Sequence, residues 1–254
     1  MTITATEYDN IFLADENIDA IADVYERDGI VRVKDMLSAE DLRTARNELA
    51  RIFATLTPAH GKAKVTFEPD GKTIRNTWHL EKDSQFFNEL WQRPAIQKLI
   101  SKLVHGEPEL SAVETFNKPA RVGSAVPAHQ DNAYFCQNPP DMLTVWIAID
   151  PATLENGPIY YIPGSHRKLL PHKPSGVTGN SMGLAEPVEC ENPFIGTLEP
   201  GDALIHHCQT IHYSAPNTTD KPRCALLIVY RGKHTKIVPE LAEVYAVGKK
   251  ASNS

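Results

Sequence analysis

From about residue 108 to residue 231 the chain is a series of short apolar or alternating runs that proline, glycine and asparagine interrupt. Examples are "MLTVWIAID", "PIYYIPG", "FIGTLEPGD" and "CALLIVYRG". Many closely spaced runs of this length, bounded by turn residues, predict the strands of a β-sandwich or barrel rather than βαβ units. This half of the sequence therefore predicts a mainly β core.

The first hundred residues follow a helical pattern instead. "ENIDAIADVYERDG" has apolar residues at helical spacing and ends at Gly29, a good helix stop. After the strand-like "IVRVKDM", Ser38 with Asp41 three residues later is an N-terminal capping signal for another helix. A third helical stretch, "NELWQRPAIQKLISKLVHG", is interrupted by Pro94. The polar stretch 57–83 predicts a long loop near a site entrance.

No linker-like segment divides the 254 residues, a length that suits one large domain with a sizeable core. We therefore expect one domain over 1–254. Its parts would be helices over about 15–106, a β core over about 108–232 and a C-terminal tail over 233–254.

Composition excludes several classes of partner. The net charge is −6 and the basic residues are scattered, which argues against a nucleic-acid surface. The longest apolar run, "CALLIVY", is far shorter than the roughly 20 residues that a membrane span needs. The start of the chain shows no secretory pattern and the four cysteines no metal-site spacing, so we expect a cytoplasmic protein with reduced thiols. The oligomeric state stays open.

His129 and Asp131 stand two residues apart in "AHQDNAYF". In extended chain such residues point the same way, so an imidazole and a carboxylate could share one divalent ion such as Fe(II), Mn(II) or Zn(II). A polar turn produces the same triplet by chance. Taken alone, this pair leaves a metal site and a structural turn both open.

A second histidine-rich stretch, "GDALIHHCQTIHY", contains His206, His207 and His212 and is followed by Arg223. With His212 ending one strand and Arg223 starting its antiparallel neighbour, both side chains would face one cavity. A buried arginine needs a partner, because an unpaired buried charge is very costly. A dicarboxylic co-substrate that chelates the metal would supply one by bidentate pairing.

At this point the sequence resembles the phytanoyl-CoA dioxygenase family of Fe(II)/2-oxoglutarate oxygenases. The resemblance lies in "HQD" at 129–131, "TVWIAID" at 144–150, "ENGPIYYIPGSH" at 155–166 and the motifs from Gly201 to Arg223. It covers roughly residues 15–232. It implies a double-stranded β-helix, or jelly roll, in agreement with the many short strands.

The resemblance also implies a set of metal ligands. His129, Asp131 and His212 would form the two-histidine, one-carboxylate triad that holds Fe(II). Related halogenases have a small residue in place of the acid, so the presence of Asp131 disfavours halogenation. The implied reaction consumes O2 and 2-oxoglutarate, releases succinate and CO2, and oxidises a C–H bond, most simply to an alcohol. Some relatives desaturate, cyclise or epimerise instead.

Other roles are carried over by position. Arg223 would pair with the distal carboxylate of 2-oxoglutarate, Ser214 would hydrogen-bond nearby, and Trp146 would lie beside the co-substrate. "PGSH" at 163–166 is a hallmark of the family, and its Pro-Gly pair indicates a structural turn rather than ligands.

The remaining histidines have less direct roles in this interpretation. His206 shares strand parity with His212, which favours support or packing beside the metal over ligation. His207 has the opposite parity and is expected in the core or at the surface. His79 would either line a substrate entrance or lie in a solvated loop.

Two alternatives remain. "GNSMG" at 179–183 matches the nucleophile elbow of a serine hydrolase, with Ser181 as nucleophile. That elbow needs a strand before the serine and a helix after it, whereas the flanking prolines favour a glycine-rich loop. The other alternative is a jelly roll that binds metal and keto acid without turnover. The substrate is not encoded in these motifs, but the absence of a basic CoA-binding patch favours a small molecule.

Overall fold

A computed structural model describes residues 11–177 and 180–251 of the chain. The helices are α1 (Ile18–Asp28), α2 (Ala39–Phe53), α3 (Gln85–Leu90), α4 (Pro94–Leu103), α5 (Asn132–Phe135) and α6 (Pro239–Ala251). The strands are β1 (Ile30–Val33), β2 (Val65–Phe67), β3 (Ile74–Thr77), β4 (Pro108–Lys118), β5 (Val126–His129), β6 (Gln137–Asn138), β7 (Met142–Ala148), β8 (Ile159–Tyr161), β9 (His172–Val177), β10 (Asn180–Leu184), β11 (Phe194–Gly196), β12 (Ala203–His207), β13 (His212–Ser214), β14 (Arg223–Gly232) and β15 (Lys236–Ile237).

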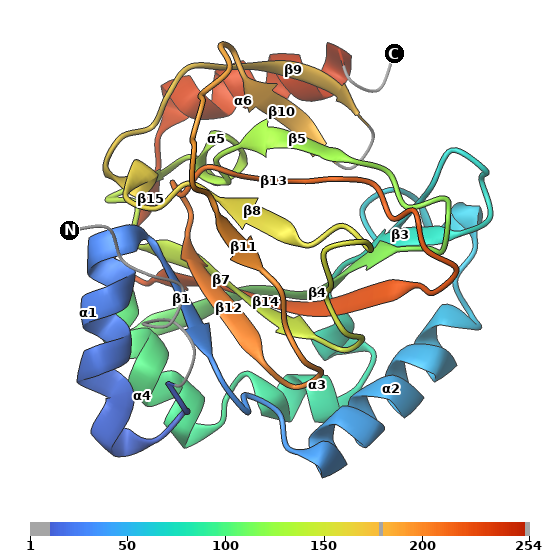
Figure 1. Cartoon of the computed structure of the whole chain (residues 1–254). Coiled ribbons are helices and arrows are strands. Elements are labelled where there is room, and N and C mark those ends of the chain that lie inside the picture. The colour runs from blue at the N-terminus through green and yellow to red at the C-terminus, as the bar shows by residue number, and fades with distance from the viewer. Residues whose placement is uncertain (1–10, 178–179, 252–254) are drawn as a thin grey trace.

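Two antiparallel sheets face each other and form the body of the molecule (Figure 1). The larger has seven strands in the order β1-β12-β7-β14-β4-β3-β2, and the smaller has four in the order β11-β8-β13-β5. Two-stranded ladders, β9 with β10 and β6 with β15, extend this body. The predicted jelly roll with helices at its N-terminal end is confirmed.

The large sheet is buried on both faces, which strand β7 shows best. All seven of its residues are buried. Val145 and Ile147 belong to the core between the sheet and helices α1 to α4, which cover its outer face (Figure 1). Trp146 and Ala148, of opposite parity, belong to the core between the two sheets. This explains why "LTVWIAI" reads as a continuous apolar run rather than an alternating one. None of the described helices is long and apolar enough to cross a membrane.

The predicted helix boundaries at Gly29, Ser38 and Pro94 are confirmed. Gly29 ends α1 with a positive φ of 73°, which glycine adopts without strain. Ser38 and Asp41 form a reciprocal capping box at the start of α2. Pro94 begins α4 after a break that follows α3.

The "PGSH" motif is a turn, as predicted, and it docks on the end of α1. The backbone N–H of Gly164 donates to the carbonyl of Asp28 over 2.8 Å, and the His166 ring donates to the carbonyl of Glu26 over 3.2 Å. A Cβ on Gly29 would lie 2.5 Å from the His166 ring. This motif therefore ties the first helix to the loop after β8.

One expectation about an irregular segment was wrong. Residues 57–83 are not one long loop, because β2 and β3 form a hairpin that joins the large sheet through β4. The strands were missed because they are three and four residues long and mostly polar. The C-terminal tail is also structured. Helix α6 lies against β9, β10 and α5, and its Tyr245 reaches the interior cavity (Figure 1).

Candidate metal centre

The small sheet brings the two outer members of the predicted triad together. His129 is the last residue of β5 and His212 the first of β13, and the antiparallel register places them directly opposite each other. Asp131 follows at the start of α5, where its helical backbone, φ −59° and ψ −30°, turns the carboxylate back toward the histidines. A helical turn, rather than the extended chain expected from the spacing, thus aligns His129 with Asp131.

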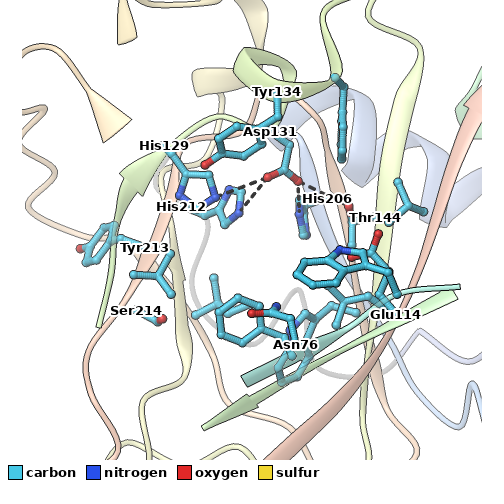
Figure 2. A pocket seen from close by; sticks show the side chains of 18 of the residues that line it. Asn76, Glu114, His129, Asp131, Tyr134, Thr144, His206, His212, Tyr213 and Ser214 are labelled. Carbon is cyan, nitrogen blue, oxygen red and sulfur yellow. Dashed lines mark hydrogen bonds and ion pairs between the residues drawn. The ribbon is translucent and has the colours of Figure 1, made fainter. Parts of the chain in front are cut away.

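The three side chains converge on one point. The Nε2 atoms of His129 and His212 lie 3.4 and 3.6 Å from Oδ1 of Asp131, and one ligand atom from each residue falls within 4.8 Å of the others (Figure 2). All three residues are at least nine-tenths buried. Two imidazoles and a carboxylate are a donor set suited to ferrous iron, with the remaining coordination positions open.

The tautomers of both histidines are fixed by the backbone. Nδ1 of His129 donates to the carbonyl of Pro127 over 2.8 Å, and Nδ1 of His212 donates to the carbonyl of Thr210 over 2.9 Å. A carbonyl can only accept, so the proton lies on Nδ1 and Nε2 is the nitrogen that can donate its lone pair to a metal. Burial lowers the pKa of His212 well below its usual value, which keeps that ring neutral.

The second oxygen of Asp131 is held from behind. Its Oδ2 accepts from Nε2 of His206 over 3.2 Å and from the Thr144 hydroxyl over 3.4 Å, while the Tyr161 hydroxyl lies 3.2 Å from the other nitrogen of His206. Burial alone would raise the pKa of Asp131, but the surrounding imidazoles of His212, His129 and His206 outweigh it and hold the pKa well below its usual range. His206 therefore supports the carboxylate, as expected, although it does so from β12 of the large sheet and does not share a strand with His212.

Arg223 starts β14 and is 1% exposed. Its Nε and Nη1 atoms find no hydrogen-bond partner among the described residues, and its guanidinium carbon lies 4.9 Å from the centre of the Trp146 ring. Burial lowers the pKa of Arg223 to about 10, so the group stays cationic at neutral pH. Buried donors without acceptors are costly, and a bound carboxylate is the partner that would satisfy them. The residues present thus fit a dicarboxylate.

One cavity of about 260 Å3 connects these groups. The three ligands, Thr144, His206, Trp146, Ser214 and Arg223 all line it. Aromatic side chains make up much of the remaining wall, namely Trp78, Phe116, Tyr134, Phe135, Tyr213 and Tyr245. Figure 2 shows the His129–His212 pair on one side, with Glu114 and Asn76 across the cavity.

Sequence reasoning missed part of this wall. Asn76 and Trp78 lie in the stretch expected to be a loop, and Tyr245 in the stretch expected to be a tail. Glu114 and Phe116 carried a usable signal, because they share parity in the alternating run "ELSAVETFNK" and so face the same side of β4.

The other singled-out histidines lie outside the cavity wall. His207 packs near the rings of Tyr25 and His166, in the core-or-surface place expected from its parity. His79 is 3.0 Å from the Glu81 carboxylate and does not line the cavity.

The predicted glycine-rich loop around Ser181 was wrong, although Thr178 and Gly179 lie outside the described residues. From Asn180 to Leu184 the backbone is strand β10, paired with β9. A nucleophile elbow requires a helix directly after the serine. Because the strand continues past Ser181, the structure does not build that elbow.

Comparisons with known proteins agree with this geometry. The sequence profile of the phytanoyl-CoA dioxygenase (PhyH) family matches residues 25–225. The ectoine dioxygenase of Halomonas elongata is 27% identical over 247 residues, covering 90% of this chain and 73% of the relative. The L-proline trans-4-hydroxylase of Streptomyces griseoviridis is 27% identical over 228 residues, covering 81% and 83%.

Solved structures share the fold. EctD from S. alaskensis, crystallised with 2-oxoglutarate and 5-hydroxyectoine, superposes with a TM-score of 0.70 at 22% identity, over 83% of this chain and 74% of EctD. The α-ketoglutarate-dependent epimerase SnoN from nogalamycin biosynthesis superposes with a TM-score of 0.70 at 23% identity, over 91% of each chain. At these identities the likeness shows a common architecture.

Proposed function

This chain belongs to the phytanoyl-CoA dioxygenase (PhyH) family, and from that premise we propose how its own residues divide the work of the reaction. It is an iron(II)- and 2-oxoglutarate-dependent dioxygenase. We assign iron binding to His129, Asp131 and His212. One observation carries this assignment: three buried donors converge, and both histidines present an unprotonated Nε2 toward the carboxylate.

We assign the co-substrate to the far end of the cavity. Arg223 would bind the distal carboxylate of 2-oxoglutarate through its fork of N–H donors, and the Ser214 hydroxyl would donate to the same carboxylate. The Trp146 ring would shield the guanidinium from water, because the guanidinium carbon lies over that ring, 4.9 Å from its centre. The unsatisfied Nε and Nη1 atoms of Arg223 support this placement.

Bound iron(II), 2-oxoglutarate and O2 together supply the power to oxidise a C–H bond, with succinate and CO2 as the products of the keto acid. The chain provides the geometry around this chemistry. Thr144 and His206 orient Asp131 by donating hydrogen bonds to its second oxygen, so the first oxygen stays aimed at the histidines. The aromatic wall excludes bulk water from the substrate side.

The substrate would be a small molecule, and the outcome would be hydroxylation at a C–H bond held near the triad. A cavity of about 260 Å3 leaves room for a compact substrate beside the co-substrate. Two of the relatives carry the names of enzymes that act on small molecules, ectoine and L-proline.

We further propose that the whole chain works as one oxygenase domain. Strand β1 of the helical N-terminal part is an edge of the large sheet, and Tyr245 of the C-terminal part lines the cavity. Both ends of the chain thus contribute to the same body.

Succinate formation tests the function. Iron(II) and 2-oxoglutarate, added anaerobically to the metal-free protein, should produce a visible charge-transfer absorption, and admission of O2 should then yield succinate even without substrate, at a slow rate. A protein that binds both without forming succinate would be the non-catalytic binder. A protein that binds neither would overturn the assignment of the triad.

A further inference from the structure

Glu114 is the one carboxyl besides Asp131 among the described residues that line the cavity. It lies on β4, in register with Leu227 of β14, which is in turn in register with Trp146 of β7. Residues in register across a sheet point to the same face. The Glu114 side chain therefore projects into the cavity from the same face of the sheet as Trp146, across from the His129–His212 pair (Figure 2).

The register of β4, β14 and β7 also shows where Glu114 lies along the cavity relative to Arg223 and Thr144. Arg223 is in register with Lys118, four residues farther along β4 and so roughly 13 Å away from Glu114. Thr144, which touches Asp131, is in register with Val229 of β14 and Ala112 of β4, only two residues from Glu114. Along the strands Glu114 thus lies nearer to the level of Thr144 than to that of Arg223, and no ion pair joins it to Arg223 among the described residues.

The surroundings of Glu114 do not provide a cation. No lysine, arginine or histidine in the described part of the chain forms an ion pair with it, and the Trp78 side chain is its hydrogen-bond partner. Burial and, to a smaller extent, the negative charges of Asp131 and Glu81 together raise the pKa of Glu114 to about 8. A carboxyl held in such a wall has a large unfavourable charging energy until a ligand offsets it.

We propose that Glu114 determines the specificity of this cavity and selects a small substrate that carries a protonated amine. The inference rests on the proposed function and names the substrate class of the same site. Arg223 and Glu114 direct the two ligands to different places in the cavity. The guanidinium attracts the keto acid and repels an ammonium group, whereas the carboxylate attracts the ammonium group and repels a second acid. The rings of Trp78 and Phe116 on this side add faces on which a cation can rest.

An ammonium group beside Glu114 stabilises the ionised carboxylate, so amine binding at neutral pH releases the proton that the empty site holds. A neutral ligand that accepted a hydrogen bond from the protonated acid would release none. Proton release therefore separates recognition of a cation from simple filling of the cavity.

The test is calorimetry on the zinc-loaded protein with 2-oxoglutarate, which does not turn over. Three amines are each compared with the alcohol of the same shape: benzylamine with benzyl alcohol, cyclohexylamine with cyclohexanol, and phenethylamine with phenethyl alcohol. We expect at least one amine to bind about tenfold or more tightly than its alcohol. At pH 7 that amine should release protons on binding and its alcohol should not, measured in two buffers of different ionisation enthalpy.

Variants of Glu114 test whether its carboxyl group causes the preference for amines over alcohols. Glu114→Gln keeps the shape and removes the charge, so it should abolish both the amine preference and the proton release. Glu114→Asp should keep both in weakened form. Glu114→Met replaces the glutamine variant if that variant does not fold, and it should lose both. The matched control is Glu109→Gln on the same strand, whose carboxylate pairs with Arg231 at the surface and which should behave as wild type.

Three results would overturn the proposal: no amine binds more tightly than its alcohol, amine binding releases no proton, or Glu114→Gln keeps the preference. Uncoupled succinate formation, measured on the iron-loaded form of the same preparations, separates the two levels of inference. A protein that forms succinate but shows no amine preference refutes the role of Glu114 alone. A protein that does neither refutes the oxygenase function as well.

Discussion

His129 and His212 face each other across the β5–β13 ladder with ring centroids 4.1 Å apart, and each donates Nδ1–H to the backbone carbonyl two residues before it. The same type of local hydrogen bond therefore fixes the orientation and the tautomer of both rings. Because it needs only the backbone, the orientation of both Nε2 atoms exists before any metal binds.

Replacing the carboxylate of the triad should remove the metal. Asp131→Asn keeps the shape of the side chain but loses the charge that balances Fe(II), so we expect iron affinity to fall more than about 100-fold and succinate formation to be lost. Anaerobic titration with Fe(II) measures the first and a coupled succinate assay the second. Asp220→Asn, an exposed site paired with Arg121, is the control. Unchanged iron affinity in Asp131→Asn would remove this residue from the ligand set.

Loss of the hydrogen bond from His206 to Asp131 should reduce iron affinity less than loss of the Asp131 carboxylate itself. His206→Leu removes the bond to Oδ2, and we expect iron affinity to fall about 10- to 100-fold while the protein stays folded. His207→Gln, the next residue on β12 and of opposite parity, should leave iron affinity unchanged. Equal losses in both variants, with equal drops in Tm, would indicate general damage to the strand.

Arg223→Met should have opposite effects on stability and on function. The ligand-free protein should gain about 1 to 4 kcal/mol in free energy of unfolding, because a buried cation with unsatisfied donors is removed. At the same time 2-oxoglutarate should no longer raise the Tm, as it does in wild type by binding the folded state. Arg231→Met, farther along β14 and paired with Glu109, should keep the response to 2-oxoglutarate. A variant that is still stabilised by 2-oxoglutarate contradicts the role of Arg223.

The metal-free protein should lose stability as the pH falls below about 6.5. Burial lowers the pKa of His207 to about 3, so the unfolded chain binds a proton in this range and the folded chain does not. Stability is therefore present above the unfolded pKa and lost below it, by about 2 kcal/mol at pH 5 from this residue. Urea unfolding at pH 7.5 and pH 5 measures the loss. His207→Asn should flatten that part of the profile, and an unaltered profile would argue against a neutral His207.

Gly29→Ala should destabilise the protein by about 3 kcal/mol or more. The new Cβ would combine a positive φ of 73° with contacts of 2.5 Å to His166 and Thr210. Gly71→Ala separates the two effects, because its φ is 68° but nothing lies within 4 Å of the new Cβ. That control should cost only about 1 kcal/mol in urea unfolding. Equal costs at both sites would mean that the "PGSH" turn moves away from Gly29 without penalty.

Local chemistry in the sequence was enough for several element boundaries, and the family resemblance supplied a candidate triad. Gly29, Ser38 and Pro94 end or begin helices through local backbone effects, so these helix boundaries can be predicted without knowing the fold. The resemblance to the phytanoyl-CoA dioxygenase family implied His129, Asp131, His212 and Arg223 as site residues, in agreement with the donor chemistry of iron and of a dicarboxylate.

Tertiary structure alone decided what surrounds those groups. The register of β13 on β5 sets His212 against His129, and the register of β4 on β14 turns Glu114 into the cavity four residues away from the level of Arg223. Short polar strands such as β3 and a terminal helix such as α6 gain their stability from partners far along the chain, so their own residues carry little signal. Sequence thus indicated which groups would do chemistry, while long-range packing determined what else they face, and with it the substrate that the cavity would select.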